Sequence, residues 1–412
     1  MRDFYPEDMV WRNRVFDAWR AAAERFGFQN YDACVVESLE LLQRKSGEEV
    51  SEQIYAFEDK SGRKLALRPE MTPTLARMVA ARQTRLPFPI KWYAIAQCFR
   101  YERMTRGRKR EHYQLNMDII GSEDVLCEAE ILGAAVAAMR DMGLPDEAWR
   151  IHVSSRALLG ELLAKSGIPE VQHAAVFIAL DKRGKISDEE IAGLLRAEGL
   201  GDAAIAKTFE LLAVTSLEGA EALAGAESPA IANLKALFAL AREMGYEELL
   251  MFDIAVIRGL SYYTGIVFEA FDVQRKFRAI FGGGRYDSLL ALVGGQPTPA
   301  VGMGFGDVVV GEVLREVLGS RCPVARRGYM VGYMAIEQRP AAVAFAARLR
   351  AEGNDVDLAL LPQKPKHFFS KAGASSAKYA VFLGPDDLIA GVAQVKNLET
   401  REVLPMALAP VR

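Results

Sequence analysis

The stretch FRYERMTRGRKREHYQLNMD, residues 99–118, decides how the rest of the chain is interpreted. Its first half is strongly basic, because five arginines and one lysine lie within residues 100–110. A solvated charged loop is the simplest interpretation of such a run. The residues on either side predict two strands, at 91–102 and 112–120, which would form a hairpin that presents the basic loop.

The polar residues of these two predicted strands follow a period of two. Arg100 and Glu102 would share one face of the first strand, because successive side chains point to opposite faces. The same spacing puts Gln114, Asn116 and Asp118 on one face of the second strand. Burying such a set of guanidinium, carboxylate and amide groups is costly. We therefore expect this face of the sheet to line a polar pocket.

This stretch resembles motif 2 of the class II aminoacyl-tRNA synthetases, in the form found in the histidyl family. The resemblance implies that Arg100 clamps the α-phosphate of ATP and the amino-acid carboxylate, which suits the planar fork of arginine. It also implies that Glu102 reads the adenine amino group and that Arg108 binds the far phosphates. Gln114 and Asp118 would hydrogen-bond the imidazole of bound histidine. Asp118 stands where the family usually has glutamate.

A second block, LRPEMTPTLAR, occupies residues 67–77. By itself it predicts the end of a strand and the start of a helix, since Thr72 and Pro73 suit the N-cap and the first helical position. The block is similar to the LRPExT block of the histidyl family. That resemblance implies that Glu70 and Thr72 hold the α-ammonium group of histidine.

A third block, RGLSYYTG at residues 258–265, resembles the histidine-specific motif RGLDYYTG. A lone tyrosine pair at a strand start is usually part of a core, but the match over eight residues is more specific. The family places Arg258 against the α-phosphate and the histidine carboxylate during activation, where stabilisation of charge matters more than proton transfer. Tyr262 and Tyr263 would line the imidazole pocket. Ser261 replaces the usual aspartate.

A fourth block, GGGRYD at residues 282–287, is also similar to the histidyl family. Three consecutive glycines predict a tight turn, or a place where backbone approaches a ligand closely. Two roles are open for Arg285. It would either bind the ATP phosphates or support the pocket.

Two positions depart from the family pattern. Motif 1, which serves the dimer interface, usually carries a proline where this chain has Cys34. Motif 3, here GMGFGDVV at residues 302–309, usually ends in an arginine that braces the nucleotide, but this chain has Val309. We expect Arg285 or the arginines of residues 103–110 to hold the triphosphate instead.

Composition restricts the class of protein. The formal charge of the 412-residue chain is -3, so contact with nucleic acid must come from local basic patches. No run approaches the ~20 apolar residues of a membrane span, and the first residues lack the apolar segment of a signal peptide. The cysteine and histidine spacings fit neither a metal site nor a disulfide framework. We expect free thiols, no metal held by the protein itself, and a cytoplasmic location.

The resemblance implies an α+β catalytic domain with a mainly antiparallel sheet of the class II synthetase type, followed by a C-terminal α/β anticodon-binding domain. We place the catalytic domain at residues 1–322, with an Ala- and Leu-rich helical insertion at about 168–240, and the second domain at 323–412. The second domain offers local positive charge for RNA phosphates. Its lysines are Lys364, Lys366, Lys371 and Lys378.

The resemblance implies a homodimeric enzyme that joins histidine to its tRNA, with ATP as substrate and Mg²⁺ on the phosphates. One alternative is a synthetase-like regulatory subunit of the ATP phosphoribosyltransferase of histidine biosynthesis. Another is a nucleic-acid-binding accessory protein without adenylation activity. The C-terminal domain argues against the first alternative. The joint presence of Glu70, Arg100, Glu102 and Arg258 argues against the second.

Overall fold

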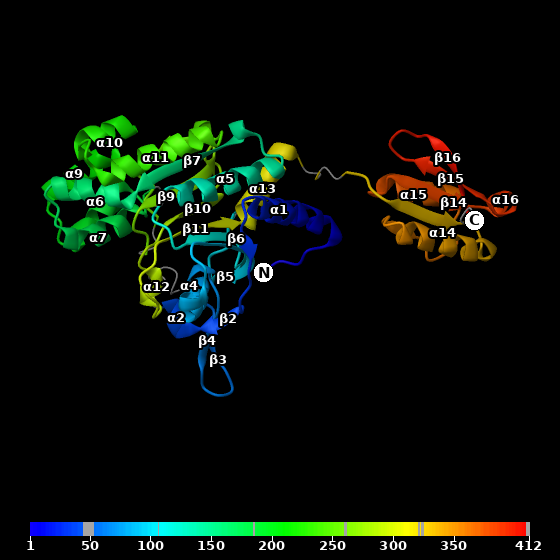
Figure 1. The fold of residues 1–412 in the computed structure, drawn as a ribbon, viewed down its shortest axis with the longest axis horizontal. Coiled ribbons are helices and arrows are strands. Elements are labelled where there is room, and N and C mark those ends of the chain that lie inside the picture. The colour runs from blue at the N-terminus through cyan, green and yellow to red at the C-terminus, as the bar shows by residue number, and fades with distance from the viewer. Residues whose placement is uncertain are drawn as a thin grey trace. The chain divides into compact units, whose positions relative to one another are not determined.

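The computed structural model describes residues 1–43, 53–105, 107–183, 186–258, 262–319, 322 and 325–408. The chain divides into two compact units, Met1–Cys322 and Pro323–Arg412, both drawn in Figure 1. Residues 320, 321, 323 and 324, around the predicted domain boundary, lie outside the described residues. Among the described residues, no helix is long and apolar enough to cross a membrane.

An eight-stranded mixed sheet is the framework of the first unit, in the order β1-β5-β6-β11-β10-β9-β7-β8. Its strands are β1 (Gln29–Asn30), β5 (Ile90–Phe99), β6 (Glu111–Ile120), β7 (Trp149–Ser155), β8 (Leu250–Phe252), β9 (Ile266–Asp272), β10 (Phe281–Arg285) and β11 (Ala300–Gly306). The two outermost pairings, β1 with β5 and β7 with β8, are parallel, and the inner pairings are antiparallel. The mainly antiparallel sheet predicted from the sequence is confirmed.

The two faces of this sheet differ because apolar residues and glycines alternate along β11. Met303 and Phe305 of β11 belong to the main hydrophobic core, together with Met117 of β6. Gly302 and Gly304 point to the other face, where they are paired with Asp118 and Asn116 of β6. We call this second side of the sheet the glycine face. The shared face predicted for Gln114, Asn116 and Asp118 is its β6 portion.

The glycine run at 282–284 is not a turn, so the tight turn, one of the two structures predicted for it, was wrong. It forms the middle of β10, which pairs with β9 on one side and β11 on the other. All five residues of β10 are buried. Close packing, not chain reversal, requires these glycines, because a Cβ on Gly283 would lie 2.8 Å from the Cα of Met303.

Three helices cover the core face of the sheet (Figure 1): α1 (Pro6–Arg25), α5 (Leu126–Asp141) and α13 (Asp307–Leu318). The indole of Trp19 in α1 is completely buried and packs edge-on against the ring of Phe305, 5.3 Å between centroids. Phe281 of β10 packs on the same ring at 5.0 Å. This apolar side fixes which residues of each strand must face the opposite side.

The helical insertion predicted at about 168–240 is confirmed, since the secondary structure of the described residues there is helical. Its helices are α7 (Glu170–Leu180), α8 (Asp188–Ala197), α9 (Asp202–Leu212), α10 (Leu217–Ala224) and α11 (Pro229–Glu243). They follow α6 (Arg156–Lys165), against which α7, α10 and α11 pack. Ser187, Ser216 and Ser228 each accept a hydrogen bond from the first turn of a helix, which explains where α8, α10 and α11 begin.

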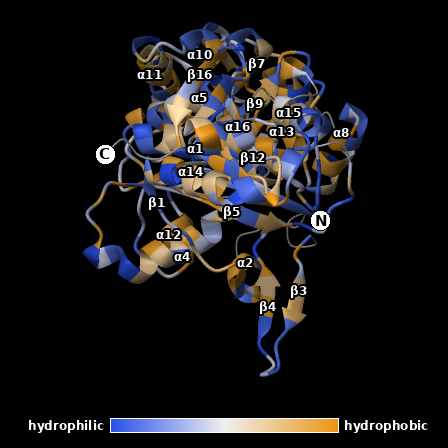
Figure 2. Ribbon diagram, turned by 90° about the vertical axis from the view of Figure 1, so that its right-hand side faces the viewer, coloured by the Kyte–Doolittle hydropathy of each residue, from blue (hydrophilic) through white to orange (hydrophobic). Residues whose placement is uncertain are grey.

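A smaller antiparallel sheet, in the order β2-β4-β3, precedes the strands β5 and β6 in the chain. Its elements are β2 (Val36–Ser38), β3 (Ala56–Glu58) and β4 (Lys64–Leu67), with α2 (Leu39–Gln43) and α4 (Thr72–Arg82) close by. Figure 2 shows the β3–β4 hairpin projecting with hydrophobic strands and a hydrophilic turn. Val36 and Phe57 are exposed on this small sheet.

The second unit is a five-stranded α/β fold in the order β13-β12-β14-β15-β16. Its elements are β12 (Tyr329–Tyr333), α14 (Arg339–Ala351), β13 (Val356–Leu358), α15 (Pro365–Ala374), β14 (Tyr379–Leu383), α16 (Pro385–Ala390), β15 (Val392–Asn397) and β16 (Val403–Ala407). Alternate residues of β12 serve two cores, Val331 with Phe345 of α14 and Met330 with Phe368 of α15. Helices therefore cover both faces, and the α/β fold predicted for this domain is confirmed.

Candidate active site

A cavity of about 830 Å³ opens on the glycine face, and we call it the open cleft. Its floor includes Gly282 of β10 and Gly304 of β11. Its walls come from the motif 2 stretch, the connection between β9 and β10, the start of α13 and the end of α7. Arg100, Glu102, Arg108, Gln114 and Arg258 are the sequence-predicted site residues that line it.

The charge of the open cleft is strongly biased. Its described lining residues include seven cationic side chains: Arg100, Arg108, Lys109, Arg183, Arg258, Arg275 and Arg278. They include four carboxylates: Glu102, Asp181, Asp253 and Glu269. A partly enclosed surface with excess positive charge concentrates anionic ligands.

The first strand of motif 2 is shorter than predicted, so the prediction that Arg100 and Glu102 share a strand face was wrong. β5 ends at Phe99, so Arg100 and Glu102 lie in the loop that follows. The Nε of Arg100 donates to the carbonyl of Pro69 at 2.9 Å. Glu102 and Arg108 form an ion pair at 3.2 Å. The two residues predicted to bind opposite ends of ATP therefore hold each other.

Arg258 joins the cleft to the interior of the site. Its Nη1 donates to Glu269 at 2.6 Å, and its guanidinium lies 5.9 Å from the ring centroid of Tyr263. Burial opposes its charge, but Tyr263 and Glu269 outweigh burial and raise the pKa of Arg258 above its ordinary value. The backbone φ of Arg258 is 59°, a strained value for a residue with a side chain and one that is common at functional sites. Ser261 lies outside the described residues.

Asp118 is the centre of a group of buried polar residues that we call the buried acidic cluster: Glu70, Asp118, Tyr262, Tyr263 and Tyr286. The hydroxyl of Tyr286 donates to Oδ1 of Asp118 at 2.5 Å, while Oδ2 has no hydrogen-bond partner. Burial raises the pKa of Asp118 to about 7. A buried acceptor without a partner is rare in a folded protein and is typical of a ligand-binding position.

Glu70 repeats this pattern at the other end of the cluster. Oε2 of Glu70 accepts a hydrogen bond from the hydroxyl of Tyr262 at 3.3 Å, and Oε1 has no partner. Burial raises the pKa of Glu70, and the charges of Arg100 and Arg258 oppose that shift. Thr72, two residues further along, is buried in the first turn of α4. The cluster thus lies within electrostatic reach of the cations of the open cleft.

Glycines on β10 and β11 leave the space that these side chains occupy. A Cβ on Gly302 would collide with the carboxylate of Asp118, and one on Gly304 would collide with the amide of Gln114. A Cβ on Gly282 would collide with the guanidinium of Arg258. The glycines of motif 3 and of the GGGRYD block therefore act as a floor for polar side chains.

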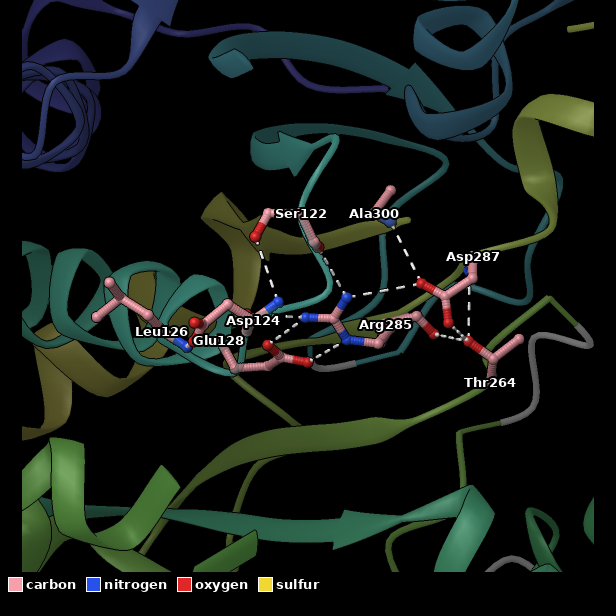
Figure 3. Close-up of polar contacts among 8 residues, drawn as sticks. All are labelled: Ser122, Asp124, Leu126, Glu128, Thr264, Arg285, Asp287 and Ala300. Atoms are coloured by element: carbon pink, nitrogen blue, oxygen red, sulfur yellow. Dashed lines mark hydrogen bonds and ion pairs between the residues drawn. The ribbon is translucent and has the colours of Figure 1, made fainter. Parts of the chain in front are cut away.

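Arg285 lies elsewhere, and the ATP-binding role is not supported by its position. It points to the core side of the sheet, because it is three residues from Gly282 and side chains alternate along β10. Figure 3 shows its guanidinium forming two hydrogen bonds with Glu128 of α5, at 2.6 and 2.7 Å, and others with the carbonyls of Ser122 and Asp124. Of the two predicted roles, support of the pocket is the one that this geometry favours.

Motif 3 places a hydrocarbon where the family has an arginine. Val309 lines the cleft next to Gly107 of the motif 2 loop, since a Cβ on Gly107 would lie 3.7 Å from Cγ2 of Val309. The preceding Asp307 accepts hydrogen bonds from Arg2 and from the backbone N–H of Tyr113, both at 2.8 Å. Asp307 is thus engaged in structure, and Val309 offers no charge to the cleft.

Sequence reasoning missed three residues. Tyr286 anchors Asp118, and Glu269 pairs with Arg258. Tyr31 has a buried hydroxyl without a hydrogen-bond partner. Burial raises the pKa of this hydroxyl, and the charge of nearby Asp118 raises the pKa further. Tyr286 ends the GGGRY sequence and could have been found there. Glu269 and Tyr31 carry no local signal, because only the packed sheet brings them to the site.

The arrangement combines a cationic cleft for a polyanion with adjacent buried carboxylates for a small cation. Together with the antiparallel sheet and its motif residues, it defines a class II aminoacyl-tRNA synthetase. Residues 1–306 match the family described as histidyl-tRNA synthetase, and residues 327–411 match the anticodon-binding domain. The chain therefore belongs to the histidyl-tRNA synthetase family.

Individual relatives cover almost the whole chain. A histidine–tRNA ligase of Arabidopsis thaliana, described as chloroplastic/mitochondrial, is 43% identical over 99% of this chain and 84% of its own length. A histidine–tRNA ligase of Opitutus terrae is 38% identical over 97% of this chain and 93% of its own. These relatives support the enzyme over the regulatory subunit.

Solved structures show the same fold. The histidyl-tRNA synthetase of Nostoc superposes with a TM-score of 0.83 at 22% identity, covering 98% of this chain and 95% of that one. A Bacillus halodurans structure described as an ATP phosphoribosyltransferase regulatory subunit/histidyl-tRNA synthetase has a TM-score of 0.75 at 22% identity, covering 90% and 94%. At this identity both establish the fold alone.

Proposed function

We propose that the protein is a histidine–tRNA ligase that activates histidine with ATP and transfers it to the 3′ end of histidine tRNA. The observation that carries the proposal is the adjacency of two complementary regions. The open cleft has excess positive charge, and the buried acidic cluster has two carboxylate oxygens without partners. ATP is a polyanion, and histidine has an ammonium group and an N–H-bearing ring.

Histidine would bind in the buried acidic cluster. Oδ2 of Asp118 is available to the imidazole, and Oε1 of Glu70 is available to the α-ammonium group. Gln114, whose amide nitrogen donates to Asn116 at 3.2 Å, would also contact the imidazole. Tyr262 and Tyr263 pack with a centroid distance of 4.9 Å and supply ring surfaces beside both carboxylates. An amino acid without a polar ring would leave Asp118 unpaired, which disfavours its activation strongly. Thr72 would support the ammonium end.

ATP would bind in the open cleft. Arg100 and Arg258 would stabilise the charge that develops on the α-phosphate when an oxygen of the histidine carboxylate attacks it and pyrophosphate leaves. Glu102 and Arg108 would exchange their mutual ion pair for the adenine amino group and the phosphates. A ribose hydroxyl of the tRNA then attacks the histidyl carbonyl, and AMP leaves.

Magnesium would arrive with ATP as part of the substrate. The cleft carboxylates fit this arrangement, because Glu102 and Glu269 already pair with arginines. Among the residues that the structure describes, no group of three histidine, cysteine or acidic side chains is placed to hold a metal. The phosphates and water would supply most of its ligands.

The second unit would contact the tRNA. Lys364, Lys366 and Lys371 are exposed on or next to α15, and Lys378 follows it in the chain. Phosphates attract such a basic surface in a salt-dependent way.

We also propose a homodimer, supported by the exposed apolar residues Val36 and Phe57 of the small sheet, with light scattering as the test. A cytoplasmic location would suit the four free cysteines.

The deciding experiment is exchange of labelled pyrophosphate into ATP with each standard amino acid in turn. We expect exchange with histidine only. Exchange with another amino acid would overturn the assignment of the buried acidic cluster. A folded sample that binds histidine but exchanges with none of them would favour a regulatory paralogue over a ligase.

A further inference from the structure

The cations of the open cleft differ in what already neutralises them. Arg108 pairs with Glu102, and Arg258 pairs with Glu269. Arg183 lies 3.8 Å from Asp188. The guanidinium of Arg275 packs 3.8 Å from the ring centroid of Phe271 and lies within 3.1 Å of both ring nitrogens of His152.

Two cations stand apart. Within the described part of the chain, Lys109 and Arg278 line the cleft with no hydrogen bond or ion pair from their side chains, whereas Arg100 donates to the backbone carbonyl of Pro69. Lys109 also lines a neighbouring cavity of about 180 Å³ near the N-terminus, so the open cleft is not its only environment. Arg278 is exposed and lines the open cleft but not the neighbouring cavity. It is therefore the cation with the most capacity left for a ligand.

The connection that carries Arg278 is held firmly. The buried carboxylate of Asp272 accepts hydrogen bonds from the backbone N–H groups of Lys276 at 2.9 Å and Phe277 at 3.0 Å. Beyond Arg278, the N–H of Ile280 donates to the carbonyl of Ala270 at 2.7 Å. Because the backbone is fixed on both sides, a ligand contact made by Arg278 loses little conformational entropy.

The start of α13 offers the cleft no cation at the position where the family has an arginine. Val309 is aliphatic and packs toward Gly107, and Arg285 is occupied by Glu128 behind the sheet. A triphosphate in the cleft needs cations beyond Arg100 and Arg258, which we place at the α-phosphate, and beyond Arg108, which must first leave its ion pair with Glu102. The β9–β10 connection is where the structure offers one.

We propose that Arg278 is a phosphate-binding residue of this protein, bracing the β- and γ-phosphates of ATP in place of the arginine absent at Val309. The inference deepens the proposed function and rests on it. A guanidinium matches phosphate oxygens in bidentate fashion, which a lysine ammonium does not. In this proposal Arg278 contacts ATP and not histidine.

The test compares four proteins: the unchanged chain, Arg278→Ala, Arg278→Lys and Lys276→Ala. Lys276 is the matched control, because it lies on the same connection but pairs with Glu316 at 2.6 Å and does not line the cleft. ATP binding is measured without any amino acid by equilibrium dialysis, and the KM values for ATP and histidine are measured by pyrophosphate exchange. Thermal unfolding checks that each variant is folded.

We expect Arg278→Ala to weaken ATP binding and raise the KM for ATP about tenfold, as for loss of one charge-assisted contact. Arg278→Lys should lose less, and Lys276→Ala should match the unchanged chain. The KM for histidine should stay the same in all four. ATP binding by Arg278→Ala equal to that of the unchanged chain would overturn the proposal, as would an equal loss in Lys276→Ala.

A fifth protein, Lys109→Ala, separates the rival. A loss of ATP binding in Lys109→Ala with none in Arg278→Ala would assign the phosphates to Lys109 and overturn the proposal. Failure of the proposed function is distinguishable, because it would appear as ATP binding without histidine-dependent exchange. In that case the dialysis comparison still decides whether Arg278 binds the phosphates.

Discussion

The open cleft and the buried acidic cluster share one face of one sheet but treat charge in opposite ways. In the cleft, arginines remain charged and most are held by carboxylates of the protein, such as Arg108 by Glu102 and Arg258 by Glu269. In the cluster, Asp118 and Glu70 have raised pKa values because burial disfavours their charged forms. A hydroxyl holds one oxygen of each, and the other oxygen has no partner.

This difference follows from the size and charge of what each region would bind. A large polyanion can take the place of the carboxylates in these ion pairs, because its phosphates offer each arginine an equivalent charged acceptor. A small cation in a dry site must supply all the missing partners, and this requirement produces selectivity. The cleft is therefore expected to govern rate and ATP affinity, and the cluster is expected to govern the choice of amino acid.

Replacement of Arg285 has the largest expected effect. It also tests the comparison, which fails if Arg285 belongs to the cleft. Arg285→Ala leaves Glu128, which is completely buried, without its cation. Breaking a buried ion pair in this way costs about 3–5 kcal/mol in the free energy of unfolding. Urea unfolding at neutral pH measures it.

A matched double variant serves as the control for Arg285. Arg285→Met with Glu128→Leu removes both charges and should recover most of the lost stability. The KM for ATP in the double variant should be close to that of the unchanged chain. A large rise in that KM would return Arg285 to the ATP site.

Arg258 links the two regions, and its removal should have the next largest effect. Arg258→Ala is expected to lower kcat/KM for histidine-dependent pyrophosphate exchange by about 10²–10³-fold, or about 3–4 kcal/mol, because its contact strengthens in the transition state. ATP binding should fall far less. Arg20→Ala is a suitable control, since Arg20 is an exposed arginine of α1 paired with Asp17. Near-normal turnover of Arg258→Ala would contradict the role given to Arg258.

Asp118→Asn isolates the cluster. It should raise the KM for histidine by roughly 10- to 100-fold, as for a lost charge-assisted hydrogen bond, and leave the KM for ATP unchanged. The variant should also be more stable than the unchanged chain at pH 8, because a neutral amide carries no charge into the buried cluster. An equal rise in both KM values would show that the two regions are not separable.

The pH dependence of that stability difference follows from the pKa of Asp118, which rises from an ordinary value of 3.8 to about 7 on folding. The folded state holds the proton more tightly, so the contribution of Asp118 to stability falls as pH rises from about 4 to 7 and then stays low. The stability gained by Asp118→Asn should grow over this window by up to about 4 kcal/mol. Urea unfolding at pH 5 and pH 8 tests the sign.

Glu102→Gln has the smallest expected effect. It breaks the pair with Arg108 but keeps a group that can accept a hydrogen bond from adenine. We expect the KM for ATP to change by less than about tenfold, with weaker discrimination against GTP in competition assays. A loss as large as that of Arg258→Ala would place Glu102 in the chemical step instead.

Much of the site was predictable because β5 and β6 are adjacent in the chain. The hairpin and the shared face of Gln114 and Asp118 follow from a period of two within one local element. The glycine run at 282–284 was misinterpreted as a turn for the opposite reason. Glycines permit a turn and a close approach equally well, and the neighbours that decide between them lie in β9 and β11.

Family membership, the order of the motifs and the residue types available for chemistry were determined by the sequence itself. The departures at Cys34, Asp118 and Val309 were visible there too. Only the tertiary structure decided which face of β10 carries Arg285, which carboxylate neutralises Arg258, and that Arg278 reaches the cleft. Those outcomes depend on burial and register between strands far apart in the chain, and such long-range packing has no local pattern to reveal it.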